Sequence, residues 1–326
     1  MDRSTIPEPV TAVTELASAW LPQRMEAVEA RLADLVEHGG PQLSADAAAT
    51  LAAGGKRMRP LLVLLCAGPE AGAEAIRAAT AVELVHMATL VHDDVLDAAA
   101  LRRGQPTVFA RSGRARAVAV GDLLFSLAFC ELAQPGGARQ VEALARAAVA
   151  LARGELMQRQ DAFDLSVSEA RYLERCELKT GALFECACTI GSGVAAEPGL
   201  GPLAAFGRDI GLAFQQLDDV LDVSGPSERT GKARGTDLLD GTVTWPLILA
   251  AQRDPAVAKL DLRGLDPESA VAVCDRIEAT GATEQVRASA RRRVAKAKAE
   301  LATAELESAR LEQLELVADG VVERYS

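Results

Sequence analysis

The feature that most restricts the possible folds is the near absence of strand-forming patterns in a chain of 326 residues. Alanine, leucine, glutamate and arginine dominate, aromatic residues make up 3% of the chain, and alternating β-branched residues are almost missing. Such sequences favour helices over strands. The pattern therefore predicts an all-α protein, with helices at residues 10–37, 45–53, 60–67, 73–97, 115–132, 138–160, 168–191, 202–223, 244–252, 267–280 and 283–318.

Glycine and proline separate most of these predicted helices, as in Gly39-Gly40-Pro41 and Gly225-Pro226. The longest irregular stretch covers residues 224–242, and long loops of this kind are usually functional or disordered. No change of composition marks a linker. We therefore predict one domain over residues 1–326, with an N-terminal helical segment at residues 1–40 and a core from about residue 50 to residue 326.

One five-residue sequence, Asp-Asp-Val-Leu-Asp, occurs twice, at residues 93–97 and 218–222. Carboxylates at i and i+4 share one face of a helix, where their repulsion costs roughly 0.2–0.5 kcal/mol per pair. Building this repulsion twice among apolar neighbours indicates a bound cation. Oxygen ligands favour Mg²⁺, which usually binds one or two carboxylates together with substrate phosphates. A phosphorylated substrate is therefore expected.

Composition and charge exclude several other classes of protein. The chain has 35 basic and 46 acidic residues, and its net charge of -11 argues against a general nucleic-acid binder. We find no secretory signal in the first twenty residues and no apolar run long enough for a transmembrane segment. The six cysteines lack zinc-ligand spacing and mostly lie in Ala/Leu-rich segments. We expect them to be reduced and buried in a cytoplasmic protein.

Basic residues accompany the aspartates. Residues 54–60, Gly-Gly-Lys-Arg-Met-Arg-Pro, form a glycine-led turn before a helix, which suits an anion, although a basic surface turn is the alternative. Arg102 and Arg103 follow the first cluster, and each guanidinium presents a fork suited to phosphate. Lys179 has no acid three or four residues away. Its partner must be water, another segment or a ligand.

Together these blocks resemble the trans-isoprenyl diphosphate synthases, the polyprenyl synthetase family, and in particular bacterial geranylgeranyl and longer-chain synthases. The resemblance runs from about Gly54 to Leu249 and includes both aspartate motifs, Lys179-Thr180, Phe214-Gln215 and Gly231-Lys232. It implies a helical bundle with a deep central cavity, the isoprenoid synthase fold, usually as a homodimer. In this family Mg²⁺ ions, typically three, hold an allylic diphosphate between the two motifs.

The resemblance also implies a role for each matching residue. Isopentenyl diphosphate would attack the cation left when the allylic diphosphate departs, and loss of a proton would give an all-trans polyprenyl diphosphate. The implied metal ligands are Asp93, Asp94, Asp97, Asp218, Asp219 and Asp222. Arg102, Lys179 and Lys232 would bind the allylic diphosphate, Lys56, Arg59, His86 and Arg103 would bind isopentenyl diphosphate, and Lys179, Thr180 and Gln215 would stabilise the cation.

Two positions depart from the family pattern. Many members have a lysine where this chain has Thr242, so one phosphate contact is either missing or supplied by Arg234. Only two residues separate Asp94 from Asp97, whereas bacterial farnesyl diphosphate synthases have four, which argues against that type.

Product length in this family depends on residues four and five positions before the first acid, where bulky aromatics stop the growing chain. Here they are Thr89 and Ala88, both small, which favours geranylgeranyl or longer products. Alternatively, Phe125, Phe129 or Met157 forms the floor of the cavity.

Other functions are weighed against this one. A terpene cyclase on the same scaffold would not need the isopentenyl diphosphate residues, all of which are present. A non-catalytic subunit would be expected to lose its aspartates, and both motifs are whole. A catalytic subunit of a heteromeric prenyl synthase stays open as an alternative.

Overall fold

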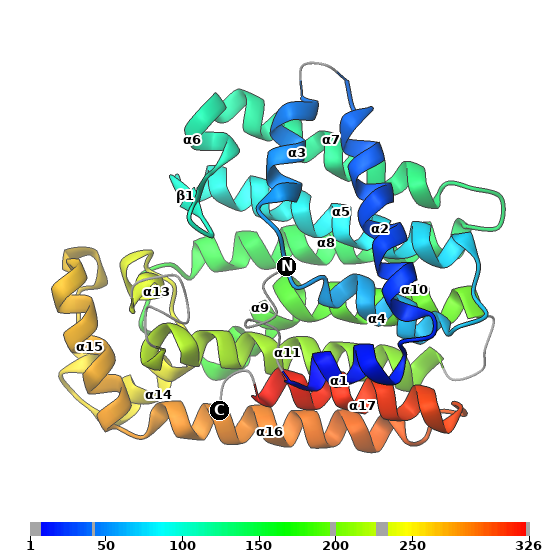
Figure 1. Cartoon of the computed structure of the whole chain (residues 1–326). Coiled ribbons are helices and arrows are strands. Elements are labelled where there is room, and N and C mark those ends of the chain that lie inside the picture. Colours follow the sequence, from blue (N-terminus) through cyan, green and yellow to red (C-terminus); the bar gives the residue numbers. More distant parts are fainter. Residues whose placement is uncertain (1–7, 41–42, 196–199, 226–233, 324–326) are drawn as a thin grey trace.

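The computed structural model describes residues 8–40, 43–195, 200–225 and 234–323. It confirms the all-α class (Figure 1). The first half contains α1 (Glu8–Leu16), α2 (Leu21–Glu37), α3 (Ser44–Ala52), α4 (Met58–Ala67), α5 (Ala73–Leu96), α6 (Val108–Ser112), α7 (Arg114–Leu132) and α8 (Ala138–Gln160). The second half contains α9 (Glu169–Cys176), α10 (Ala182–Ala195), α11 (Leu200–Ser224), α13 (Thr236–Leu239), α14 (Trp245–Arg253), α15 (Pro267–Ala279), α16 (Ala282–Leu301) and α17 (Ser308–Glu323). Single 3₁₀ turns lie at Val257–Lys259 and Leu262–Gly264.

Helix α11 is shared by two hydrophobic cores. Its Leu217 belongs to the larger core, which α2, α4, α5, α7 and α10 build, whereas its Val220 belongs to the smaller core around α14 and α15. Gly211 lets α11 approach α10 closely, because a Cβ there would lie 2.9 Å from Cβ of Phe184 and 3.0 Å from Cα of Gly181. The second aspartate motif therefore lies on a rigid helix that is packed on two sides.

Two long predicted helices are each broken in the structure. The range 10–37 is divided into α1 and α2, and proline at the second position of α2 suits a new helix start. The range 283–318 is divided into α16 and α17 at residues 302–307. An unbroken helix over that range would be about 54 Å long. The reversal instead folds α17 back, so that Leu314 and Val317 enter the larger core.

Three further features were not anticipated. A hairpin of β1 (Leu101–Arg102) and β2 (Gln105–Pro106) follows the first aspartate motif. A π-helical segment, Glu177–Gly181, interrupts the predicted helix at residues 168–191. The prediction that the cysteines are buried is wrong for Cys130, which is exposed on α7, while the other five are buried. Among the described helices, none is long and apolar enough to cross a membrane.

Candidate active site

Both aspartate motifs lie at the C-terminal ends of helices. Asp93 and Asp94 belong to the last turn of α5, and residues 218–222 belong to the last turns of α11. Figure 1 shows these two ends at the same side of the bundle, on the left. The helix macrodipole is negative at this end and disfavours carboxylates by about 0.3–1 kcal/mol. The fold therefore adds to the repulsion within each motif, and both effects favour a cation between the helices.

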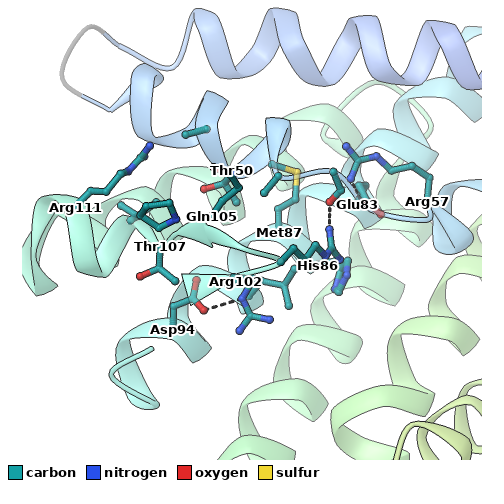
Figure 2. Close-up of a pocket in the computed structure, with 17 residues that line it drawn as sticks. Thr50, Arg57, Glu83, His86, Met87, Asp94, Arg102, Gln105, Thr107 and Arg111 are labelled. Atoms are coloured by element: carbon teal, nitrogen blue, oxygen red, sulfur yellow. Dashed lines mark hydrogen bonds and ion pairs between the residues drawn. The ribbon is translucent and has the colours of Figure 1, made fainter. Parts of the chain in front are cut away.

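The acids of the first motif have unequal surroundings. Oδ1 of Asp94 accepts a hydrogen bond from Nε of Arg102 at 2.7 Å (Figure 2), and the exposed Asp97 is paired with Arg159 of α8. Asp93 is half-buried, and burial raises the pKa of its carboxyl to about 6, against the opposing charge of Lys179. Asp93 is thus the acid of this motif whose negative charge gains most from a bound cation.

In the second motif Asp219 is almost fully buried, with an exposed fraction of 3%. Its Oδ1 accepts from Nε2 of Gln215 at 2.8 Å, and its Oδ2 accepts from the hydroxyl of Tyr172 at 2.7 Å. Burial raises the pKa of this carboxyl to about 7. Oδ2 of Asp222 accepts from the backbone N–H of Asp237 at 3.2 Å, and this contact ties α11 to α13. Asp218 lies on the exposed side of the helix.

The π-helical segment connects the two motifs. Nζ of Lys179 donates to Oε2 of Glu155 on α8, and the positive charge of Lys179 lowers the pKa of Asp93. The next residue, Thr180, donates from its hydroxyl to Oε1 of Gln215 at 2.7 Å. Lys179 therefore acts on the first motif and Thr180 on the residue that holds Asp219. The partner of Lys179 therefore comes from another segment, α8, which is one of the alternatives that the sequence left open.

Glycine at position 154 allows α8 to lie against this segment. A Cβ at Gly154 would lie 2.6 Å from N and 2.9 Å from Cα of Lys179, and backbone atoms cannot move aside. We expect Gly154→Ala to lower the free energy of unfolding by about 1–3 kcal/mol and to reduce activity, because Lys179 is displaced. Thermal unfolding measures this.

The matched control is Gly193→Ala, since Gly193 is also helical and has nothing within 4 Å of its Cβ position. It is expected to stabilise the protein by up to about 1 kcal/mol. Equal melting temperatures for the two variants would contradict the close contact at Gly154.

The basic residues of the turn at 54–60 divide between structure and site. Arg57 adopts a left-handed φ of 49°, and its buried guanidinium pairs with Glu29 at 2.5 Å and Glu83 at 2.8 Å. Arg59 stacks on Phe184, 4.6 Å from the ring centroid, and burial lowers its pKa to about 10. Lys56 is exposed. Arg57 therefore anchors the turn through its two carboxylate partners.

His86 lies among these cations. Burial lowers the pKa of its imidazole well below the usual value, and the guanidinium groups of Arg59, Arg103, Arg102 and Arg57 lower it further. The ring is therefore neutral at physiological pH. A neutral ring donates one N–H to an anion without adding charge.

The hairpin presents both arginines that follow the first motif. Arg103 and Gly104 have φ values of 52° and 75°, as a two-residue turn between twisted strands requires. Arg102 reaches Asp94, and Arg103 donates to the carbonyl of Gly54. A pocket lies between this hairpin, α3, α5 and α6, and Figure 2 shows its lining. The hairpin thus closes one side of the region around His86.

Several predicted residues lie elsewhere or are simply packed. Lys232 is outside the described residues. Arg234 pairs with Asp275 at 2.9 Å and Glu278 at 3.0 Å, so its guanidinium faces α15 and not a phosphate at Thr242. Ala88 is fully buried, and the half-buried Thr89 donates from its hydroxyl to the carbonyl of His86 at 2.8 Å.

Sequence reasoning gave no role to three residues that contact the site: Glu155, Arg159 and Tyr172. Glu155 and Arg159 form an i,i+4 pair on α8, with Nε 2.9 Å from Oε1, and this spacing is a recognisable signal. Tyr172 had no signal, because its contact with Asp219 joins segments 47 residues apart.

The carboxylates fit Mg²⁺ only in combination with a ligand. Within the described ranges, no three His, Cys, Asp or Glu side chains gather closely enough to hold a metal ion alone. The carboxylates of the half-buried Asp93 and the buried Asp219 nevertheless offer oxygen atoms whose negative charge burial disfavours. Mg²⁺ usually takes one or two carboxylates and completes its shell with water and substrate phosphates. The residues therefore fit ions that bind together with a diphosphate.

Comparison with known proteins tests the family resemblance. Residues 41–273 match the polyprenyl synthetase family. The chain belongs to this family. It is 37% identical over 285 residues to heptaprenyl diphosphate synthase component 2 of Geobacillus stearothermophilus. The matched region covers 86% of this chain and 89% of the relative. Membership confirms the predicted enzyme class, a polyprenyl diphosphate synthase that transfers prenyl groups.

Solved structures of polyprenyl synthetases have the same fold. The decaprenyl diphosphate synthase of Rhodobacter capsulatus is 35% identical, with a TM-score of 0.86, covering 96% of this chain and 99% of that one. The polyprenyl synthase of Caulobacter crescentus, solved in complex with calcium and isoprenyl diphosphate, is 34% identical with a TM-score of 0.85 and covers 97% and 98%. The predicted isoprenoid synthase fold is confirmed.

Proposed function

We propose that this chain condenses isopentenyl diphosphate with an allylic diphosphate and makes an all-trans polyprenyl diphosphate of geranylgeranyl length or longer. One observation carries the proposal: the adjacent residues Lys179 and Thr180 reach different motifs. The charge of Lys179 lowers the pKa of Asp93, whereas the hydroxyl of Thr180 donates to Gln215, whose amide donates to Asp219. A diphosphate bound at Lys179 would therefore lie between the two carboxylate clusters.

The metal ligands of this proposal are Asp93, Asp94, Asp97, Asp218, Asp219 and Asp222. Three Mg²⁺ ions, when bound, supply positive charge to the departing diphosphate. Arg102 and Lys179, together with Lys232, bind the diphosphate and stabilise the charge that develops on it, which lowers the barrier electrostatically. To serve in this way, Arg102 exchanges its bond to Asp94 for a bond to phosphate.

The remaining residues handle the carbon chemistry. The carbonyl of Lys179 and the side-chain oxygens of Thr180 and Gln215 stabilise the allylic cation. Lys56, Arg59, His86 and Arg103 hold isopentenyl diphosphate, whose double bond attacks that cation. The adduct then loses a proton to the departing diphosphate, so no protein base is needed. The neutral imidazole of His86 among guanidinium groups supports this assignment, because it binds an anion while the arginines supply the charge.

The test is the product itself. Purified protein is incubated with labelled isopentenyl diphosphate, Mg²⁺ and either geranyl or farnesyl diphosphate, and products are measured by mass spectrometry. We expect extension to geranylgeranyl diphosphate or beyond. The proposal fails if no primer is extended, and a hydrocarbon formed without isopentenyl diphosphate would identify a cyclase.

Chain length is proposed to depend on Ala88 and Thr89. Ala88 is fully buried in α5, just over one turn before Asp93, and its side chain is small. We expect Ala88→Phe to shorten the main product by one or more isoprene units, as measured by mass spectrometry of the products. Ala272→Phe, at an exposed position of α15, is the control. Unchanged product length in a folded Ala88→Phe variant would assign the floor to Phe125, Phe129 or Met157.

A second candidate concerns assembly. The Geobacillus relative is named as component 2 of its synthase, which favours a catalytic subunit that needs a partner. Against this, we propose the homodimer that the family resemblance implies. Sedimentation of the active protein separates the two, because a homodimer is active without a second chain.

A further inference from the structure

The acids of the two motifs are held by different kinds of donor. Asp94 and Asp97 pair with the cations of Arg102 and Arg159. Asp219 instead accepts from two neutral groups, the amide of Gln215 and the hydroxyl of Tyr172. A cation partly cancels the charge of a carboxylate, whereas a neutral donor fixes its orientation and leaves the charge. Outer-sphere donors of this kind tune metal ligands in proteins.

Two neighbouring side chains pack against the ring of Tyr172. It is fully buried, its centroid lies 6.0 Å from that of Trp245, and the guanidinium of Arg175 lies 5.5 Å from the same ring. A buried phenol needs a hydrogen-bond partner for its hydroxyl. Since the ring cannot swing away between these neighbours, the hydroxyl stays directed at Oδ2 of Asp219, 2.7 Å away.

The π-helical segment brings Tyr172 into register with the site. Tyr172 and Thr180 are eight residues apart, which in an α-helix separates them by about 80° around the axis. One additional residue in the turn Glu177–Gly181 reduces this to about 20°. Both side chains then face α11, where Gln215 and Asp219 are one turn apart. Tyr172 and Thr180 thus clamp a single turn of α11 at both ends.

We propose that Tyr172 is a positioning residue for the second aspartate motif, holding the Asp219 carboxylate in the orientation that binds Mg²⁺ without cancelling its charge. This inference rests on the proposed function, in which Asp219 is a metal ligand. Tyr172 touches neither substrate nor metal. Its effect is exerted through Asp219 and therefore appears in metal affinity before it appears in the chemical step.

The test is Tyr172→Phe, which removes one oxygen and keeps the shape of the ring. Binding of Mg²⁺ is measured by calorimetry in the presence of an unreactive allylic thiolodiphosphate, and the reaction rate is measured as a function of Mg²⁺ concentration. We expect half-saturation to need about tenfold more Mg²⁺ in both measurements, with little change of kcat once Mg²⁺ is saturating.

Two controls make the outcome specific. Ser192→Ala removes another buried hydroxyl from the same helical run, one that donates to the carbonyl of Thr189 at 3.0 Å, and is expected to keep the wild-type Mg²⁺ dependence. Para-aminophenylalanine at position 172, introduced by amber suppression, restores a donor and is expected to restore Mg²⁺ affinity.

A purely structural role for Tyr172 predicts a lower melting temperature with unchanged Mg²⁺ dependence, and that result overturns the inference. So does a variant with Asp219→Asn in which Tyr172→Phe still weakens Mg²⁺ binding, because the effect then does not pass through Asp219. Failure of the wild-type protein to bind Mg²⁺ with the thiolodiphosphate is a different outcome. It overturns the proposed metal site, and the role of Tyr172 with it.

Discussion

Asp93→Asn is expected to lower kcat about 10²–10³-fold and at the same time to stabilise the metal-free protein. The loss of activity follows from removing the acid whose charge a cation compensates most. Asparagine keeps an oxygen ligand but contributes no negative charge, so a Mg²⁺ ion at this position is held less tightly. Steady-state kinetics at saturating isopentenyl diphosphate measure the first effect.

The gain in stability follows from the pKa of Asp93, which burial raises from 3.8 to about 6. A raised pKa means that the folded protein favours the protonated carboxyl. The stability that comes from this preference is fully present below the pKa of the unfolded chain, 3.8, and is lost as the pH rises through the pKa of the folded protein, about 6. Asparagine resembles the protonated form, so the variant avoids a loss of no more than about 3 kcal/mol. Its advantage is larger at pH 8 than at pH 5.

Glu312→Gln is the control, because Glu312 is an exposed acid on α17, a helix that carries neither aspartate motif. It is expected to change neither kcat nor the pH dependence of thermal unfolding. If Asp93→Asn melts at the same temperature as the wild type at pH 8 without Mg²⁺, the carboxylate of Asp93 is not the uncompensated charge that the structure indicates.

Short-range patterns in the sequence were enough to predict the all-α fold, the family and the enzyme class. The repeated Asp-Asp-Val-Leu-Asp predicts a cation site from local spacing alone, since carboxylates at i and i+4 share one face of a helix whatever the tertiary structure. The absence of an acid three or four residues from Lys179 likewise predicted that any partner comes from outside its own helix. That the partner is Glu155 depends on the close packing of α8, which a single sequence does not display.

The parts of the fold that were predicted wrongly have a common physical origin. Residues 302–307 have no glycine or proline, and their helix propensity favours continuation of α16. The chain breaks there because burying Leu314 against the larger core is worth more than one further turn of exposed helix. The contact between Tyr172 and Asp219 is long-range in the same sense, and the hairpin turn at Arg103-Gly104 is short enough to escape a search for strand periodicity.

Lys179→Ala is expected to reduce kcat about 10²-fold or more, the other large effect that the geometry predicts. Lys179 supplies a fixed positive charge between the motifs, and it is the largest opposing influence on the raised pKa of Asp93. Without it the leaving diphosphate loses a stabilising cation and Asp93 is less readily ionised. Glu155→Gln, which leaves the lysine in place but weakens its anchor, is expected to have a smaller effect.

The kinetic constants show which role Lys179 performs. An interaction made only in the transition state lowers kcat and kcat/KM equally, whereas uniform binding of the allylic diphosphate raises KM and leaves kcat unchanged. The control Lys298→Ala removes a lysine of α16 whose Nζ lies 2.9 Å from Oδ2 of Asp319 on α17, and it should change neither constant. A rise of KM alone in Lys179→Ala would limit Lys179 to substrate binding and would leave ionisation to the aspartate-bound cations and Arg102.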